Sequence, residues 1–190
     1  NENPNGPDSP NTVASIPNNE IWYTSVDNTI IEPVSTTYFG SNIISNTYKN
    51  GKGVIKFDGD ITKIGEHAFN TQIEDDEIEN KLKSITIPSS VKKIGMGAFS
   101  SCTMLTNVTI PNSVTYLGDY AFKNCYQLQT ISISDNVTSI GEETFVYCKL
   151  RTVTFGKSIS NIHETAFNQV ALRTVIWNAE NYSKAYTLPN

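Results

Sequence analysis

The amino-acid sequence predicts a β-rich solenoid in which short parallel strands stack coil upon coil. The string ITIPSSVKKIGMGAF at residues 85–99 returns nearly unchanged as VTIPNSVTYLGDYAF at residues 108–122. An Ala-Phe or Thr-Phe pair closes each unit at a nearly constant spacing, with its phenylalanine at Phe69, Phe99, Phe122, Phe145 and Phe167. A leucine opens each later unit, at Leu82, Leu105, Leu128, Leu150 and Leu172. Such periodic units cannot close a core alone, but stacked together they form a continuous one.

Composition narrows the function classes. The chain has 190 residues and a net charge of −5, which argues against nucleic acid as a partner because phosphate binding needs clustered Lys and Arg. No apolar run approaches the roughly 20 residues of a membrane helix. The chain begins at Asn1 rather than Met, which fits removal of a leader. We therefore expect membrane attachment only through an N-terminal lipid anchor outside this sequence.

Two segments precede the repeats. Residues 1–10, NENPNGPDSP, have no periodic apolar position, and residues 1–17 are predicted to form a flexible tether. Residues 18–53 are predicted to form a small β cap. Within it, residues 21–24 are expected to pair with residues 29–32 as a hairpin. Residues 42–48 and 54–57 flank the Gly-rich KNGKG and are expected to form a second hairpin.

The repeat unit has a physical reason at each position. Ile85 and Ile87 alternate as in a strand with one buried face, and Pro88 ends that strand because it has no N–H to donate. The glycine that follows Ile94 is expected to supply a positive φ. We place the solenoid at residues 54–176, with about five repeats of 22–23 residues and an acidic insertion at residues 70–80.

The pattern degrades toward the C-terminus. His163 stands where earlier units carry glycine, and Ser134 and Gly156 replace proline. Terminal repeats commonly depart from the consensus because they serve as caps. Residues 177–190 are therefore predicted to be a C-terminal cap, with Trp177, Tyr182 and Tyr186 covering the last coil.

The string LTNVTIPNSVTYLGDYAFKNC at residues 105–125 resembles the BspA-type leucine-rich repeat family. The resemblance covers residues 55–177. It implies a leucine-rich repeat solenoid of the α/β horseshoe class, with short helical or 3-10 turns between the stacked strands. It also implies an exported protein, secreted or held at the cell surface as an outer-membrane lipoprotein, that acts in adhesion or ligand binding. The expected partner is a host or bacterial surface protein or another extracellular macromolecule. The resemblance implies no catalytic residues.

No catalytic or cofactor motif stands out in the sequence. Two histidines, His67 and His163, fall at different repeat positions, so stacking cannot bring them together. No phosphate-cradling loop or strained nucleophile turn is present. We therefore expect a protein without enzymatic activity or cofactor.

Three groups of residues come into consideration as metal sites. Cys102, Cys125 and Cys148 share one repeat position, and stacking places them in a line that suits neither tetrahedral zinc nor disulfides. Buried free thiols are the favoured interpretation. The acidic insertion at residues 70–80 carries Glu74, Asp75, Asp76, Glu77 and Glu79. It lacks the pattern of a known calcium loop and is predicted to be solvated. The DGD at residues 58–60 is predicted to be a turn.

Two surfaces compete as binding sites. The outward positions of the main strands form two polar columns on the expected concave sheet. They are Ser84, Asn107, Thr130, Thr152 and Thr174 in one column, and Thr86, Thr109, Ser132, Thr154 and Ile176 in the other. These columns carry no aromatic platform, which weakens the alternative function of a carbohydrate-binding accessory protein in a glycan-uptake system; a purely structural spacer is a third possibility. The candidate partner-binding residues are therefore the tyrosines outside the core pattern, Tyr116, Tyr120, Tyr126 and Tyr147.

Overall fold

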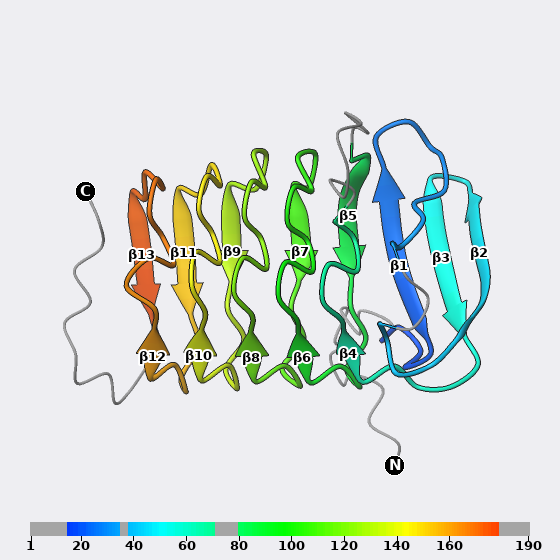
Figure 1. Cartoon of the computed structure of the whole chain (residues 1–190), viewed down its shortest axis with the longest axis horizontal. Helices are drawn as coiled ribbons and strands as arrows, with labels where there is room; N and C mark the ends of the chain where they lie inside the picture. Colours follow the sequence, from blue (N-terminus) through cyan, green and yellow to red (C-terminus); the bar gives the residue numbers. More distant parts are fainter. Residues whose placement is uncertain (1–14, 35–37, 71–79, 179–190) are drawn as a thin grey trace, which may run out of the picture.

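The computed structural model describes residues 15–34, 38–70 and 80–178. The expected tether, the acidic insertion and the end of the C-terminal cap lie largely outside these ranges. Over the described residues the chain forms a row of stacked strands with short connections (Figure 1). The solenoid fold class is confirmed. One detail of the prediction is wrong, because the connections are hydrogen-bonded turns and no described residue lies in an α- or 3-10 helix.

The strands fall into two sets. The cap and the main strands of the coils are β1 (Glu20–Ser25), β2 (Ile43–Lys49), β3 (Lys52–Phe57), β5 (Leu82–Thr86), β7 (Asn107–Thr109), β9 (Thr130–Ser132), β11 (Thr152–Phe155) and β13 (Thr174–Trp177). The minor strands are β4 (Lys63–Ile64), β6 (Lys93–Ile94), β8 (Tyr116–Leu117), β10 (Ser139–Ile140) and β12 (Asn161–Ile162).

The strands of each set pair side by side. The first sheet has the order β2-β3-β1-β5-β7, and β9, β11 and β13 form another in the order β13-β11-β9. Because β7 and β9 are neighbours (Figure 1), these two sheets form one long layer, called here the main layer. The minor strands form the parallel sheet β12-β10-β8-β6-β4. Each coil therefore crosses the main layer and turns at the repeat position that Pro88 occupies. It then crosses the minor sheet and returns through a series of turns.

A stack of phenylalanine rings occupies the interior of the coils. Phe99 and Phe122 have ring centroids 5.2 Å apart and planes 14° apart, and the rings of Phe122 and Phe145 lie 5.5 Å apart. The stack continues to Phe69 at 5.3 Å from Phe99 and to Phe167 at 5.0 Å from Phe145. All five rings are buried. The five phenylalanines that recur along the sequence therefore form one stack through the interior of the coils.

The expected role of the repeat glycines is corrected by the structure. Gly65, Gly95, Gly118 and Gly141 do not have positive φ angles. They lie where the chain packs closely, Gly65 against Tyr38 and the other three against the backbone of the preceding coil. A Cβ on Gly118 would lie 2.7 Å from the carbonyl carbon of Gly95, closer than real Cβ contacts allow. Glycine therefore recurs at this position because a side chain would not fit, and not because the backbone adopts a special conformation.

Positive φ angles occur two residues after these glycines and again further along the turns. The first column contains His67, Gly97, Tyr120 and Glu143, and the second contains Ser101, Asn124, Tyr147 and Gln169. The turns that carry the chain from the minor sheet back to the main layer thus use left-handed residues.

The N-terminal β unit differs from the prediction in its strand pairing. Strands β2 and β3 form the expected hairpin across residues 49–53. The prediction that residues 21–24 form a hairpin with residues 29–32 is wrong, because β1 pairs antiparallel with β3 on one side and with β5 on the other. Ile21 and Tyr23 are buried on its inner face. Strand β1 thereby covers the edge that the first main strand of the solenoid would otherwise expose.

Residues after β1 turn away from the sheet. Asp27 accepts hydrogen bonds from the backbone N–H and the hydroxyl of Thr29, at 3.2 and 2.7 Å. Lys81 holds the other carboxylate oxygen of Asp27 at 2.6 Å. These contacts form a local Asx-type turn, which replaces the strand expected at residues 29–32.

Trp177, expected in the C-terminal cap, is the last residue of β13 and pairs with Phe155 of β11. Its ring stacks on Phe155, with centroids 4.3 Å apart and planes 22° apart. Tyr182 and Tyr186, the other two residues expected in this cap, lie outside the described residues. Over the described ranges, the chain has no helix with the length and apolar character needed to cross a bilayer.

Candidate functional site

The two predicted polar columns run across the main layer. Parallel pairing aligns Ser84 with Asn107 and Thr86 with Thr109, and the later strands continue the same register from Thr130 onward. Ser84 also lies opposite Thr24 of β1, and their hydroxyl oxygens are 2.7 Å apart. The hydroxyl ladder, as we call these two columns, therefore extends from the solenoid into the N-terminal β unit.

Trp22 is a candidate binding residue that sequence reasoning missed. It lies opposite Thr86, so its half-buried indole adjoins the second column of the hydroxyl ladder. Its Nε1 donates a hydrogen bond to Glu20 at 2.7 Å, and the Lys52 ammonium lies 2.9 Å from the ring centroid. The alternation along β1 indicated that Trp22 points outward, but only the pairing of β1 with β5 places it beside the ladder.

A groove borders this indole. It has a volume of about 260 Å³ and is lined by Trp22, Thr86, Pro88, Ser89 and Pro111, together with Ser15 and Ile16. An aromatic ring beside hydroxyl and proline side chains is a surface on which a sugar ring can stack. The two columns themselves contain no aromatic residue, and Trp22 adds one beside them from β1.

The four candidate tyrosines come from different parts of the coils. Tyr116 belongs to β8 in the minor sheet, in the column that begins with Lys63 and continues through Lys93. Tyr120 lies in the turns, where Lys123 is 5.1 Å from its ring centroid. The negative charge of Glu142 raises the pKa of Tyr120. Tyr126 and Tyr147 share one pocket, and Lys123 interacts electrostatically with both Tyr120 and Tyr147.

Tyr126 and Tyr147 line a common pocket of about 540 Å³ at the corner where the turns lead into β9, β11 and β13. Their side chains are 43% and 50% exposed. The residues that give this corner pocket its chemistry are Tyr126, Tyr147, Lys149, Leu150, Arg151 and Arg173. The corner pocket is thus the place where exposed aromatic rings and arginines converge.

The stacking of coils positions the two arginines. Arg151 immediately precedes β11, and Arg173 immediately precedes β13. The backbone N–H of Arg151 donates to the backbone carbonyl of Gln129, and the backbone N–H of Arg173 donates to the backbone carbonyl of Arg151, both at 2.8 Å. The two arginines are therefore neighbours across one coil spacing, about 4.8 Å.

Tyr147 occupies a backbone position that is unusual for an aromatic residue. Its φ is 61°, and the equivalent residues in other coils are Ser101, Asn124 and Gln169. A left-handed conformation costs a residue with a Cβ about 1–2 kcal/mol, and Asn tolerates it best. Because the same conformation recurs at this position in other coils and also at Tyr120, it belongs to the turns of the repeat and does not by itself mark a binding site.

The cations of the corner pocket have no acidic partner among the described residues. There the ion pairs are Lys81 with Asp27 and Lys123 with Glu143, each at 2.6 Å. Lys149, Arg151 and Arg173 take part in neither. Their charges are therefore available to a ligand.

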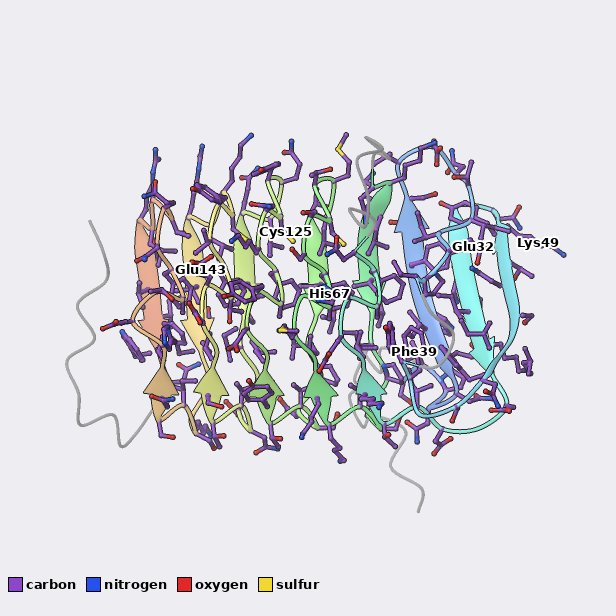
Figure 2. All side chains as sticks on the ribbon, viewed as in Figure 1. Glu32, Phe39, Lys49, His67, Cys125 and Glu143 are labelled. Atoms are coloured by element: carbon purple, nitrogen blue, oxygen red, sulfur yellow. The ribbon has the colours of Figure 1, made fainter. Side chains whose placement is uncertain are left out.

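The three cysteines are free and buried, and Figure 2 labels Cys125. Each thiol donates to the carbonyl of a phenylalanine of the preceding coil, with Sγ to oxygen distances of 3.4 Å for Cys102, 3.2 Å for Cys125 and 3.0 Å for Cys148. Burial raises the pKa of Cys102 and of Cys125. The prediction of buried free thiols is confirmed, with the added finding that the thiols act as hydrogen-bond donors.

The remaining candidates are structural. Asp58 of the DGD turn accepts hydrogen bonds from the Asn42 backbone N–H at 2.9 Å and from its Nδ2 at 2.8 Å, and these bonds lower the Asp58 pKa. His67 sits in a left-handed turn beside Gly97, whereas His163 contacts Thr165 in the last coil. Within the described ranges, no three His, Cys, Asp or Glu side chains cluster closely enough to hold a metal ion. The acidic insertion lies outside those ranges.

Comparison with known proteins identifies the repeats. The family model described as BspA type leucine-rich repeat region matches residues 7–83 and 54–174, in six copies. No curated protein matches the chain. Among solved structures, a leucine-rich cell surface protein from Faecalibacterium prausnitzii A2-165 is 29% identical with a TM-score of 0.58, over 65% of this chain and 31% of that one. The T. pallidum leucine-rich repeat protein is 26% identical with a TM-score of 0.53, over 62% of this chain and 54% of that one. The match thus spans about a third to a half of these larger proteins.

Proposed function

The chain belongs to the BspA-type leucine-rich repeat family, and we propose that it is a non-enzymatic, exported surface protein that binds an extracellular macromolecule through the corner pocket. The partner is a host or bacterial surface protein or another extracellular macromolecule. Repeat solenoids of this kind present extended surfaces for binding. The similarity to a protein described as a leucine-rich cell surface protein supports the surface location, whether the chain is secreted or held by an N-terminal lipid.

The observation that carries this proposal is the convergence of Tyr126, Tyr147, Arg151 and Arg173 on one pocket. Tyrosine and arginine are enriched among the residues that contribute most to protein–protein binding energy. Tyrosine buries a large area at low entropic cost. The hydroxyl ladder is a weaker candidate along the solenoid, because each hydroxyl exchanges a water hydrogen bond for a protein one at a net gain of only about 1 kcal/mol.

An array of extracellular proteins and glycans, probed with the purified protein, tests the proposal. Once an array component binds, the double variant Tyr126→Ala with Tyr147→Ala should weaken its affinity at least about tenfold, or about 1.4 kcal/mol. The matched control is Tyr116→Ala, which removes an exposed tyrosine from the minor sheet and should leave the affinity unchanged.

Variants of the hydroxyl ladder test whether the main layer is the binding surface instead. Thr109→Ala with Ser132→Ala should leave the affinity within about threefold, which is less than 1 kcal/mol. If this variant weakens binding more than the loss of both tyrosines does, the binding surface is the main layer and the corner pocket is not the site.

A second candidate function is carbohydrate binding as an accessory of a glycan-uptake system. The observation that favours it is Trp22, whose indole adjoins Thr86 and lines the groove with Pro88. Under this hypothesis Trp22→Ala abolishes saccharide binding on the array, whereas Tyr126→Ala with Tyr147→Ala preserves it. Saccharide binding that survives Trp22→Ala would eliminate the groove as its site.

A further inference from the structure

We infer that the corner pocket recognises an acidic peptide segment of a protein partner, whose carboxylates engage Arg151 and Arg173. This inference rests on the proposed function and specifies the chemistry of the ligand. It follows from the charge of the pocket, from the spacing of its arginines and from the kinds of hydrogen-bonding groups that line it.

The pocket concentrates positive charge in a chain that is negative overall. Lys149, Arg151 and Arg173 line it, and its lining includes no Asp or Glu, although the chain carries a net charge of −5. In Figure 2, nitrogen-tipped side chains project from the edge above β9, β11 and β13, where this pocket lies. The local potential therefore favours an anion, in contrast to the average of the surface.

The two arginines are held next to each other by the coil spacing. Backbone hydrogen bonding places Arg173 beside Arg151, and like charges on directly opposed positions of neighbouring strands destabilise the pair. A carboxylate bound between them removes this repulsion. Each guanidinium can also hold a carboxylate through two parallel N–H bonds, so acidic side chains fit this spacing better than a neutral ligand does.

The donors and acceptors of the pocket favour a peptide over a saccharide. Arg and Lys only donate hydrogen bonds, so they match a ligand that is rich in acceptors, such as carboxylates and peptide carbonyls. Sugars bring many hydroxyl donors, and the acceptors that line the pocket are confined to tyrosine hydroxyls, backbone carbonyls and the amides of Gln129 and Gln169. Leu150 adds an apolar contact for a side chain of the bound peptide.

The probe for this inference is a short fluorescein-labelled peptide that alternates pairs of glutamate with tyrosine or leucine, followed by fluorescence anisotropy with the whole chain. Arg151→Gln with Arg173→Gln should weaken binding at least about tenfold, which corresponds to about 1.4 kcal/mol. The peptide with glutamine in place of glutamate should bind as weakly to the unaltered protein. Affinity for the acidic peptide should fall as salt is raised.

The matched control is Lys56→Gln with Lys63→Gln. It removes the same amount of positive charge from exposed positions on β3 and β4 and should change the affinity less than about twofold. An equal loss in both double variants, equal binding of the glutamine peptide, or no saturable binding of the acidic peptide each overturns the inference. Polygalacturonate that binds while the acidic peptide does not would assign the pocket to an acidic polysaccharide instead.

The array experiment separates this inference from the proposed function. A protein partner whose binding is lost with Tyr126→Ala and Tyr147→Ala, but is unaffected by Arg151→Gln and Arg173→Gln, supports the corner pocket as the site and overturns acidic recognition. A partner that tolerates all four changes overturns the proposed function as well.

Discussion

Gly118 packs directly against the backbone of Gly95 in the preceding coil. A Cβ added to Gly118 would lie 2.7 Å from both the Gly95 carbonyl carbon and the Met96 nitrogen. Both atoms belong to the backbone, so neither can move aside as the end of a flexible side chain does. The same relationship recurs between Gly95 and Gly65, where the corresponding distance is 2.9 Å. The glycine column therefore sets how closely successive coils stack.

Gly118→Ala is expected to lower the free energy of unfolding by more than about 2 kcal/mol, because the added methyl forces two coils apart. The matched control is Gly59→Ala, whose added Cβ would meet only the Ser41 hydroxyl at 3.3 Å, and it should cost less than about 1 kcal/mol. Urea denaturation of both variants measures the difference. Equal losses would show that coil contact does not explain the glycine.

Phe122→Ala should lower the free energy of unfolding by about 3–5 kcal/mol, the usual range for a buried phenylalanine. The ring is fully buried and stacked between Phe99 and Phe145, so its loss opens a cavity in the middle of the phenylalanine stack. Deletion of residues 72–79, which lie outside the repeat, should have a much smaller effect in the same denaturant melts. If the deletion proves more damaging, the assignment of residues 70–80 as an insertion is wrong.

Cys102, Cys125 and Cys148 should stay reduced and react slowly with a thiol reagent until the protein unfolds. Thiolate is the reactive form, and burial raises the pKa of Cys102 and Cys125, so raising the pH to about 9 should accelerate native labelling little. Complete labelling is expected in denaturant. A native mass lower by two hydrogens would reveal a disulfide and contradict this prediction.

The Asp27 carboxyl should titrate at about pH 2, because the hydrogen bond from Lys81 lowers its pKa. The ordinary carboxyl pKa is about 3.9. A lowered folded-state pKa stabilises the protein above that ordinary value, and the stabilisation disappears as the pH falls through about 2. NMR titration should show the Asp27 midpoint moving toward the ordinary value in Lys81→Ala. An unchanged midpoint would mean that the lysine does not hold this carboxylate in solution.

The sequence by itself determined the solenoid, its period and most of its interior. The reason is that each coil repeats one local pattern and contacts its immediate neighbours, so residues at equal repeat positions must stack. That argument is sufficient to place Phe99 above Phe122 and to bury Cys125. It also aligned the hydroxyl ladder, because side chains alternate between the two faces of a strand.

Tertiary structure decided what the repeat does not encode. Strand β1 pairs with β5, a partner about 60 residues away whose identity no local pattern specifies, and this pairing alone places Trp22 beside Thr86. The tyrosines were separated for a similar reason. Tyr116 and Tyr126 are ten residues apart in one repeat, yet the coil turns between them, so one lies in the minor sheet and the other lines the corner pocket. Two residues that are close in sequence within one coil can lie on different sides of the solenoid. Two residues that are separated by a whole repeat lie on the same side.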